Sequence, residues 1–447
     1  MRTTFHLKTL AVAIATLSVA SMTNAAGLDR SGQDVTAFFQ DGTYAEAVYT
    51  YIDADVSGYD SSNNDPFNNT YVRGNKTGDI AESYDFFRYG VKTDINDTFS
   101  IGILYDEPFG ASAEYKGDNN FVANTNPADS AGEFANDPAP NNPVDGATTA
   151  ALEPAIIGAE NSTAGENTQV EVRSESLTAI LGMKFGANKN FQVYGGPVAQ
   201  RIQSDTKLRG LAYGLATGYT SHMNPDMDYG YIAGIAYSKP EIALKAALTY
   251  RSEIDHDADT FESYPLAGLL SGGALPTSRT GKIEVTTPKS VNFDFQTGIN
   301  PTTLATAKVR WVPWGDFVLT PPLYNEASQA SGRYGDDGLN LVEYDDDQWQ
   351  VELGLAKRVA PALAISGTVG WDSGAGDPTT SLGPVDGYYS VGLGAKYNVT
   401  ENWAVSAGGK YLWFGDAQGA LPTDKIVADF EDNDGFIAGV KISYQAR

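Results

Sequence analysis

Long stretches of the chain alternate between apolar residues and small or polar ones. In residues 387–399, one face of the alternation holds Tyr389, Val391, Leu393, Ala395 and Tyr397. The other face carries glycine, serine and lysine, and the same period of two recurs in 402–414 and 434–446. A period of two indicates β-strands, and a tilted strand needs ~9–11 residues to cross a bilayer. Aromatic residues stand at both ends of each apolar face, which is typical of membrane-spanning strands.

The alternation recurs along the chain, with short connections and long polar connections in turn. A membrane barrel has this layout, with short periplasmic turns and long outer loops. We therefore predict an all-β fold, a transmembrane antiparallel β-barrel of about 14 strands within residues 44–447. The predicted strands are 44–57, 80–94, 97–108, 168–186, 190–204, 228–238, 241–254, 287–299, 303–315, 347–359, 362–372, 387–399, 402–414 and 434–446. The long outer loops are predicted near 58–79, 110–166, 205–227, 255–286, 316–346, 373–386 and 415–433.

Residues 1–25 have the pattern of a Sec signal peptide. A positive start with Arg2 and Lys8 precedes the apolar run 10–20 and small residues at a cleavage position. The alternative, a membrane anchor, is disfavoured because the apolar run is shorter than the ~20 residues of a spanning helix. Export combined with barrel strands predicts the outer membrane of a Gram-negative cell.

Residues 26–43 precede the first predicted strand and are too polar and irregular to cross lipid. A barrel of this width holds water unless something fills it. We therefore expect this segment to fold back as a short luminal plug, with Phe38 and Phe39 buried. The alternative is a frayed periplasmic tail, since chain ends are often poorly ordered.

The composition limits which kinds of partner the protein can bind. The formal net charge is -26, with 56 acidic and 30 basic residues, which argues against a nucleic-acid partner. The chain has no cysteine, so neither disulfides nor thiolate chemistry is expected. We predict no cofactor and no metal site. A barrel in the outer membrane is expected to contact outer-membrane lipid and lipopolysaccharide, and the expected state is a monomer.

One predicted strand is interrupted. In 103–115, ILYDEPFGASAEY, Pro108 and Gly110 follow a clean strand. Proline removes a donor from the strand ladder and glycine has no side chain to pack, so both weaken pairing. The simpler interpretation is a turn into the outer loop, because Pro and Gly commonly open loops.

The chain resembles the FadL/TodX family of outer-membrane transporters for long-chain fatty acids and other hydrophobic compounds. The resemblance rests on AGLDRSGQ at 26–33, YDEPFGASAEY at 105–115, FQVYGGPVAQ at 191–200 and the segment 288–317. It implies a fourteen-stranded barrel with an N-terminal hatch, and passive uptake with release sideways through a gap where the third strand kinks. On this basis the lateral gate comprises Tyr105, Pro108, Phe109 and Gly110. Residues 26–43 depart from the family hatch, which is usually longer and carries an Asn-Pro-Ala motif.

Two predicted outer loops are rich in apolar residues, which is unusual for an exposed surface and suggests a binding groove. The candidates are Leu208, Leu211, Tyr213, Leu215, Tyr219, Phe261, Tyr264, Leu266, Leu269 and Leu270. The alternative is that they pack on one another and close the barrel mouth. A fatty-acid carboxylate also needs a cation, and arginine can bind both of its oxygens. Candidates expected to face the lumen are Arg173, Lys308 and Arg310; alternatively, such residues pair with lumen acids such as Glu352 and Asp294.

Three functions other than transport of hydrophobic compounds are considered: a hydrolase, a general porin and, third, a purely structural or adhesive barrel. An outer-membrane hydrolase is disfavoured because the mature chain has only His222 and His256, both in predicted loops, and no Gly-x-Ser-x-Gly motif. We therefore do not predict an enzyme. A water-filled general porin for small polar solutes is the nearer alternative, but apolar loops and a luminal plug speak against it.

Overall fold

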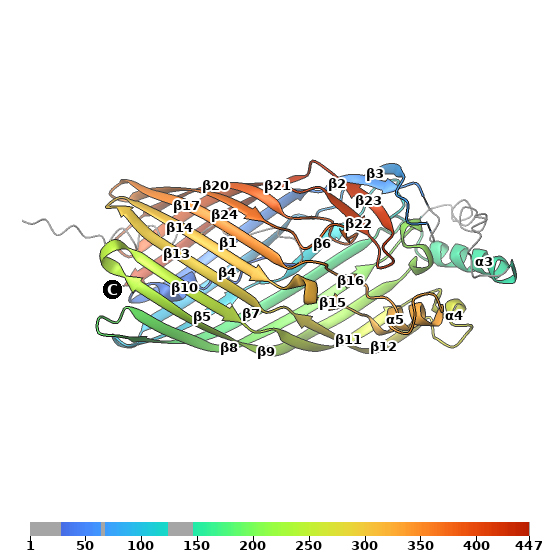
Figure 1. The fold of residues 1–447 in the computed structure, drawn as a ribbon, viewed down its shortest axis with the longest axis horizontal. Helices are drawn as coiled ribbons and strands as arrows, with labels where there is room; N and C mark the ends of the chain where they lie inside the picture. The colour runs from blue at the N-terminus through green and yellow to red at the C-terminus, as the bar shows by residue number, and fades with distance from the viewer. Residues whose placement is uncertain (1–27, 64–67, 124–145, 447) are drawn as a thin grey trace, which may run out of the picture.

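The structure is a computed structural model that describes residues 28–63, 68–123 and 146–446. The predicted signal peptide lies outside the described residues. Figure 1 shows tilted strands wound into an elongated barrel, with short helices and small strands gathered at one end. Within the described part of the chain, no helix combines the length and the apolar character needed to cross a membrane.

The barrel wall is one antiparallel sheet of seventeen strands. These strands are β1 (Thr43–Asp55), β4 (Tyr84–Asp94), β5 (Phe99–Asp106), β6 (Gly110–Glu114), β7 (Gln169–Phe185), β8 (Phe191–Lys207), β9 (Thr220–Lys239), β10 (Leu244–Arg251), β11 (Ile254–Ser263), β12 (Ser278–Thr287), β13 (Ser290–Asn300), β14 (Thr303–Val312), β17 (Gln348–Ala360), β18 (Leu363–Asp372), β20 (Tyr388–Asn398), β21 (Trp403–Phe414) and β24 (Asp434–Ala446). The wall closes because β1 pairs with both β4 and β24. Three crossings are each split into two strands, namely β5/β6, β10/β11 and β12/β13, so the described strands make 14 crossings and confirm the predicted fold class.

The remaining elements mostly lie at the mouth of the barrel. A second sheet has five strands: β2 (Ser57–Ser61), β3 (Arg73–Asp79), β19 (Thr379–Thr380), β22 (Ala417–Ala420) and β23 (Ile426–Phe430). A two-stranded sheet joins β15 (Val318–Leu319) to β16 (Val342–Glu343). The α-helices are α3 (Gly146–Ser162), α4 (Ala267–Leu270) and α5 (Pro322–Ala330), and the 3-10 helices are η1 (Thr36–Phe39), η2 (Leu211–Ala216), η3 (Pro240–Ile242) and η4 (Trp314–Asp316).

At the outer end of the barrel, several predicted strands are shorter than the observed strands, so this part of the prediction is wrong. Strand β9 begins at Thr220 rather than 228, and the predicted loop 255–286 contains most of β11 and β12. As a result His222 and His256 lie on strands and not in loops. These extensions were missed because their outward positions are charged, as at Asp255, Asp257 and Asp259, so they lack the apolar face of a membrane strand.

The apolar faces predicted from the alternation point outward. Leu393 is 72% exposed, and aromatic residues form a band across neighbouring strands, where Trp371 pairs with Tyr389 and Tyr389 with Trp413. At the periplasmic end, Phe191 pairs with Phe185 in a second band. Apolar area that remains exposed in an isolated barrel is the area that lipid covers, and aromatic bands mark the two interfaces.

Residues 28–42 lie inside the wall, and η1 contacts β1, β4 and β5. Phe38 is fully buried, with its ring against Phe39 and Tyr194. Two wall glycines make room for it, since a Cβ built at Gly102 or Gly182 would lie 2.8 Å from the Phe38 ring. Fully burying one such side chain contributes about 1.5–3 kcal/mol. We call residues 28–42 the plug segment.

The Phe38 socket can be tested with Gly182→Val. The added Cβ would meet the Phe38 ring, so the plug segment has to shift, and overpacking of this kind costs typically ~1–3 kcal/mol. We expect single-channel conductance in planar bilayers to rise. The matched control is Gly281→Val, because nothing lies within 4 Å of a Cβ built there. Equal conductance of both variants and the wild-type protein would show that Phe38 does not hold the plug segment.

Candidate functional site

Ion pairs tie the plug segment to the wall. Asp29 accepts two bonds from Arg310, from Nε at 2.6 Å and from Nη2 at 3.0 Å. Asp34 lies 2.9 Å from Lys308 Nζ and 3.5 Å from Arg88 Nη1. Removing one partner of a buried pair typically costs about 3–5 kcal/mol because an uncompensated charge remains. The two aspartates therefore anchor the plug segment to β14 and β4.

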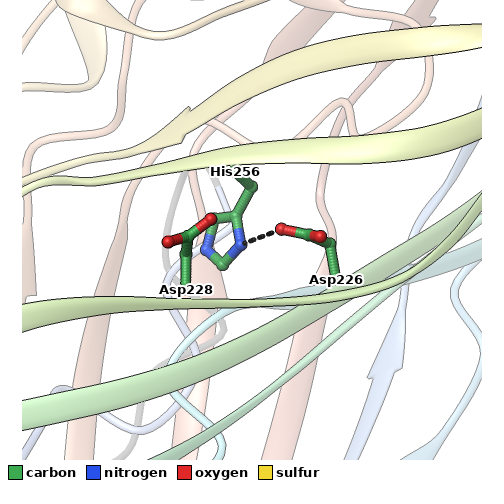
Figure 2. A group of neighbouring side chains, drawn as sticks. All are labelled: Asp226, Asp228 and His256. Carbon is green, nitrogen blue, oxygen red and sulfur yellow. Dashed lines mark hydrogen bonds and ion pairs between the residues drawn. The ribbon is translucent and has the colours of Figure 1, made fainter.

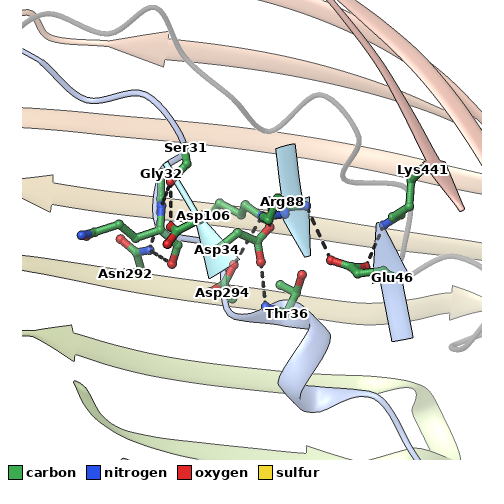
Figure 3. A network of polar contacts seen from close by, with 12 residues as sticks. Ser31, Gly32, Asp34, Thr36, Glu46, Arg88, Asp106, Asn292, Asp294 and Lys441 are labelled. Carbon is green, nitrogen blue, oxygen red and sulfur yellow. Dashed lines mark hydrogen bonds and ion pairs between the residues drawn. The ribbon is translucent and has the colours of Figure 1, made fainter. Parts of the chain in front are cut away.

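Figure 3 shows that this network continues around the lumen. Asn292 Nδ2 donates to Gly32 O at 2.8 Å, and Ser31 Oγ donates to Asp106 Oδ2 at 2.9 Å. Glu46 lies 3.8 Å from Arg88 and 3.6 Å from Lys441. The plug segment is thus bound to strands on several sides of the barrel.

The charge of Asp34 is set by its surroundings. Burial opposes ionisation, but Lys308 and Arg88 outweigh burial and hold the pKa of Asp34 well below its usual range. The Thr36 backbone N–H adds a donor at 2.7 Å. Asp34 is therefore a carboxylate at every physiological pH.

The third crossing of the wall is interrupted at its predicted weak point. The ladder between β4 and β5 runs from Asp94↔Ser100 to Tyr89↔Tyr105 and stops there. Pairing with the chain before β4 resumes only at Ala81↔Ala113. Among the described residues, 84–88 and 106–110 face each other without a ladder, and we call this break the wall gap. Outside it stand the rings of Tyr89 and Tyr105, 5.8 Å apart.

The plug segment pairs with the unladdered side of the wall gap from within. Gly110 N–H donates to Leu28 O at 2.8 Å, and Arg30 N–H donates to Pro108 O at 2.8 Å. Asp29 and Phe109 form an antiparallel bridge. Backbone groups inside a wall need such partners, because no water reaches them in the bilayer.

The side chain of Arg30 fills the space beside the wall gap. Arg30 is 4% exposed, and its guanidinium lies 3.7 Å from the centre of the Tyr84 ring. A Cβ built at Gly110 would lie 2.3 Å from Arg30 Cζ, so only glycine leaves room for the guanidinium. Sequence reasoning missed Arg30, and its only signal was its place in AGLDRSGQ.

The other predicted gate residues are arranged around this break. Pro108 is buried, and Phe109 is 1% exposed, with its ring against Trp314 at 5.7 Å. Tyr105 faces outward from β5. The four predicted gate residues are therefore together, and Arg30 lies among them.

The predicted groove residues divide into three groups. A cavity of about 710 Å³ at the mouth is lined by η2, α4 and α5, and includes Leu211, Tyr213, Leu215, Tyr264 and Leu270. Three more residues are buried in the apolar cluster at this end of the barrel, which we call the mouth cluster. These residues are Leu208, Tyr219 and Leu266. The mouth is therefore closed by packed apolar residues and also contains a cavity.

The remaining two predicted groove residues neither line this cavity nor belong to the buried cluster. Leu269 is half-buried on α4. Phe261 is 45% exposed on β11, because the strand continues where a loop was predicted. Its ring points away from the mouth cluster.

Two further cavities lie in the lumen beside the plug segment. One of about 540 Å³ is lined by Asp34, Arg310 and Tyr388. The other, of about 960 Å³, lies nearer the periplasmic end and is lined by Phe39 and Lys245. Asp294, Lys308 and Glu352 line both cavities, which therefore adjoin.

The predicted cations have different positions. Lys308 and Arg310 face the lumen as predicted, but both are engaged by the plug segment. Arg173 was predicted to face the lumen, and this is wrong, since its side chain is 66% exposed on the outer face beside Glu171. Above the membrane the inside of the wall meets the apolar mouth cluster, so valines face inward and charges face water.

Sequence reasoning did not single out Arg251, a lumen cation at the end of β10. It is 4% exposed and donates to Thr178 Oγ1 at 3.0 Å. Within the described residues no carboxylate lies within the 4.0 Å limit of an ion pair with Arg251. The sequence offered no signal for it beyond its place in a predicted strand.

A closed barrel with an apolar exterior, a plugged lumen and an apolar mouth defines an outer-membrane channel. A family model described as outer membrane protein transport protein (OMPP1/FadL/TodX) matches residues 167–444, and the chain belongs to this family. Its members include outer-membrane channels for hydrophobic compounds. A comparison with curated proteins found no match.

Similar solved structures share the fold. A FadL homologue of Pseudomonas aeruginosa is 13% identical, with a TM-score of 0.63, covering 95% of this chain and 96% of that one. The toluene transporter TodX of Pseudomonas putida is 11% identical, with a TM-score of 0.53 and coverage of 96% and 97%. The toluene transporter TbuX of Ralstonia pickettii is 11% identical, with a TM-score of 0.52 and coverage of 95% and 96%.

The ion pairs of Asp34 should make the plug segment insensitive to moderate acid. Because the pKa is lowered by folding, the stabilisation is complete above the ordinary value of 3.8 and is lost only as pH falls through the lower folded-state value. We expect constant single-channel conductance from neutral pH to about pH 4. Asp34→Asn should raise conductance at every pH, because it leaves Lys308 and Arg88 without this carboxylate. A wild-type conductance that climbs between about pH 6 and 4 would contradict this account.

Proposed function

We propose that the protein takes up long-chain fatty acids or other hydrophobic compounds passively across the outer membrane and releases them sideways through the wall gap. The observation that carries the proposal is the wall gap between residues 84–88 and 106–110, which residues 28–30 of the plug segment close from inside. Leu28, Arg30 and Pro108 make that closure through main-chain bonds and one side chain. The apolar mouth cavity supports the first step, which is capture of the substrate from outside.

Solvation explains why a side exit suits such a substrate. Releasing an alkyl chain into periplasmic water re-exposes it at a cost of roughly 0.8 kcal/mol per CH₂. Passing it directly into the bilayer avoids this cost, so the substrate moves between apolar surroundings without an energy source. The aromatic rings of Phe87, Tyr89 and Tyr105, outside the wall gap, offer an apolar surface at the exit.

The gate opens, in this proposal, when the first residues of the plug segment leave the wall gap. Arg30 then withdraws from the Tyr84 ring and from its place against Gly110. This movement breaks the ion pair between Asp29 and Arg310. The anchors at Asp34 and Phe38 lie further along the chain, so the rest of the plug segment keeps the lumen filled. This separation allows a lateral path without a general water pore.

Replacing Pro108-Phe109-Gly110 with Val-Thr-Val tests the exit. Three strand-forming residues should extend the ladder between β4 and β5, and a Cβ at Gly110 should expel Arg30. We expect oleate uptake by proteoliposomes to fall to the level of empty liposomes. A gel mobility that changes when the sample is unfolded will show that the variant has assembled.

The same proteoliposomes distinguish lateral release from the alternative function, a general porin. If the protein were a general porin, small sugars would enter at high rates and the substitution would leave their entry unchanged. Oleate uptake by an assembled Val-Thr-Val variant at the wild-type rate would reject lateral release.

We further propose that Arg251 receives the carboxylate when the substrate is a fatty acid. It is a buried cation without an ion pair among the described residues, and its partner Thr178 lies on β7. Arg251→Met keeps the length of the side chain and removes its charge. We expect oleate uptake to fall by at least about tenfold, as for a lost charged hydrogen bond, while toluene uptake stays unchanged.

Arg201→Met is the matched control, because Arg201 pairs with Glu175 on the exposed outer face. Equal loss of oleate and toluene uptake in Arg251→Met would show a structural role instead. No loss of either would exclude Arg251 as the carboxylate partner.

A further inference from the structure

A second break in the wall lies between β9 and β11, away from the wall gap. Strand β9 pairs with β10 as far as Ile232↔Arg251, and with β11 from Met223↔Thr260 onward. Among the described residues, 224–230 and 253–259 face each other without a ladder. Pro225 has no N–H to donate, and the pairing of β8 with β9 shifts register nearby. Some other interaction has to hold these two strands together.

Three side chains with metal-ligating atoms meet in this break. Figure 2 shows Asp226 and Asp228 on β9 turned toward His256 on β11. One ligand atom from each lies within 4.8 Å of the other two. His256 is 1% exposed, and the two aspartates are half-buried. The group therefore sits in the wall rather than on a mobile surface.

The surroundings of His256 suit a metal ligand. Gln200 Oε1 lies 3.2 Å from His256 Nε2, and the same oxygen accepts from Thr287 Oγ1 at 2.6 Å. When Nε2 carries the ring proton it donates to Gln200, and Nδ1 then faces Asp226 Oδ2, 3.3 Å away. Nδ1 and the carboxylate face each other across the position that a cation would occupy, and ligating histidines usually donate their other N–H in this way.

The local charge is also unbalanced. Within the described residues no lysine or arginine lies within the 4.0 Å ion-pair limit of Asp226 or Asp228. The nearby Lys282 is held by Asp259 at 3.1 Å. Two carboxylates in a half-buried site without a lysine or arginine partner favour a bound cation.

We propose that Asp226, Asp228 and His256 bind a divalent transition-metal ion that joins β9 to β11 across this break. One imidazole nitrogen and two carboxylates suit Zn²⁺ or Mn²⁺, whereas Ca²⁺ and Mg²⁺ prefer oxygen ligands alone. The ion replaces the missing ladder bonds and stiffens the wall just above the outward-facing Tyr229. Sequence reasoning predicted no metal site, because Asp226 and His256 were placed in two different loops and Asp228 at the start of a strand.

Zn²⁺ titration of the full-length protein in detergent, followed by calorimetry, tests the site. We expect one equivalent to bind to the wild-type protein, and His256→Gln and Asp228→Asn each to weaken binding by at least about tenfold. His222→Gln is the matched control, since His222 is exposed on β9, the strand of Asp226 and Asp228, and pairs with a single carboxylate, Asp205. It should bind Zn²⁺ as the wild-type protein does.

A second measurement keeps the test decisive if a variant folds poorly. Wild-type protein loaded with Co²⁺ should show visible absorption bands from nitrogen and oxygen ligands, and its thermal midpoint should rise with Zn²⁺. Assembled Asp228→Asn should lose both effects. The proposal is overturned if the wild-type protein binds no stoichiometric Zn²⁺, or if His222→Gln weakens binding as much as His256→Gln.

Discussion

The need to pair backbone groups within the wall explains the arrangement around the third crossing. A break in a barrel ladder leaves N–H and C=O groups that lipid cannot satisfy. In this protein the plug segment supplies the partners, through Leu28 and Arg30 on one side and Pro108 and Gly110 on the other. The break is therefore closed while the chain's own N-terminal segment stays against it, and this dependence underlies the proposed lateral release.

The remaining contacts of the plug segment determine how much of it can move. Asp29 and Asp34 hold it by buried ion pairs, and Phe38 holds it by packing against two glycines. Opening breaks the main-chain bonds of Leu28 and Arg30, the contact of Arg30 with Tyr84 and the ion pair of Asp29, but it leaves the anchors at Asp34 and Phe38 in place. The proposed opening is thus local, and the lumen stays filled while it occurs.

Alternation along single strands predicted the barrel well, because each strand reports its two faces independently of its partners. Residues 387–399 were assigned correctly on both faces, and Phe38 and Lys308 were correctly expected to point into the lumen. The pattern failed above the membrane, where Val170 and Val172 turn inward to the mouth cluster and Arg173 turns outward. There the inside is apolar and the outside wet, so the rule that holds in lipid is reversed. Partnerships such as Arg30 with Tyr84, or Asp226 with His256, depend on register between distant strands, which no single stretch of sequence encodes.

A reversible cross-link between the plug segment and the wall tests the central claim most directly. The chain has no cysteine, so Ser31→Cys with Asp106→Cys introduces one pair where the two side chains now share a hydrogen bond of 2.9 Å. With the disulfide formed, Arg30 is held in the wall gap, and oleate uptake by proteoliposomes should stop and then return on reduction. Equal uptake in the oxidised and reduced states, with the disulfide verified by mass spectrometry, would contradict release through the wall gap.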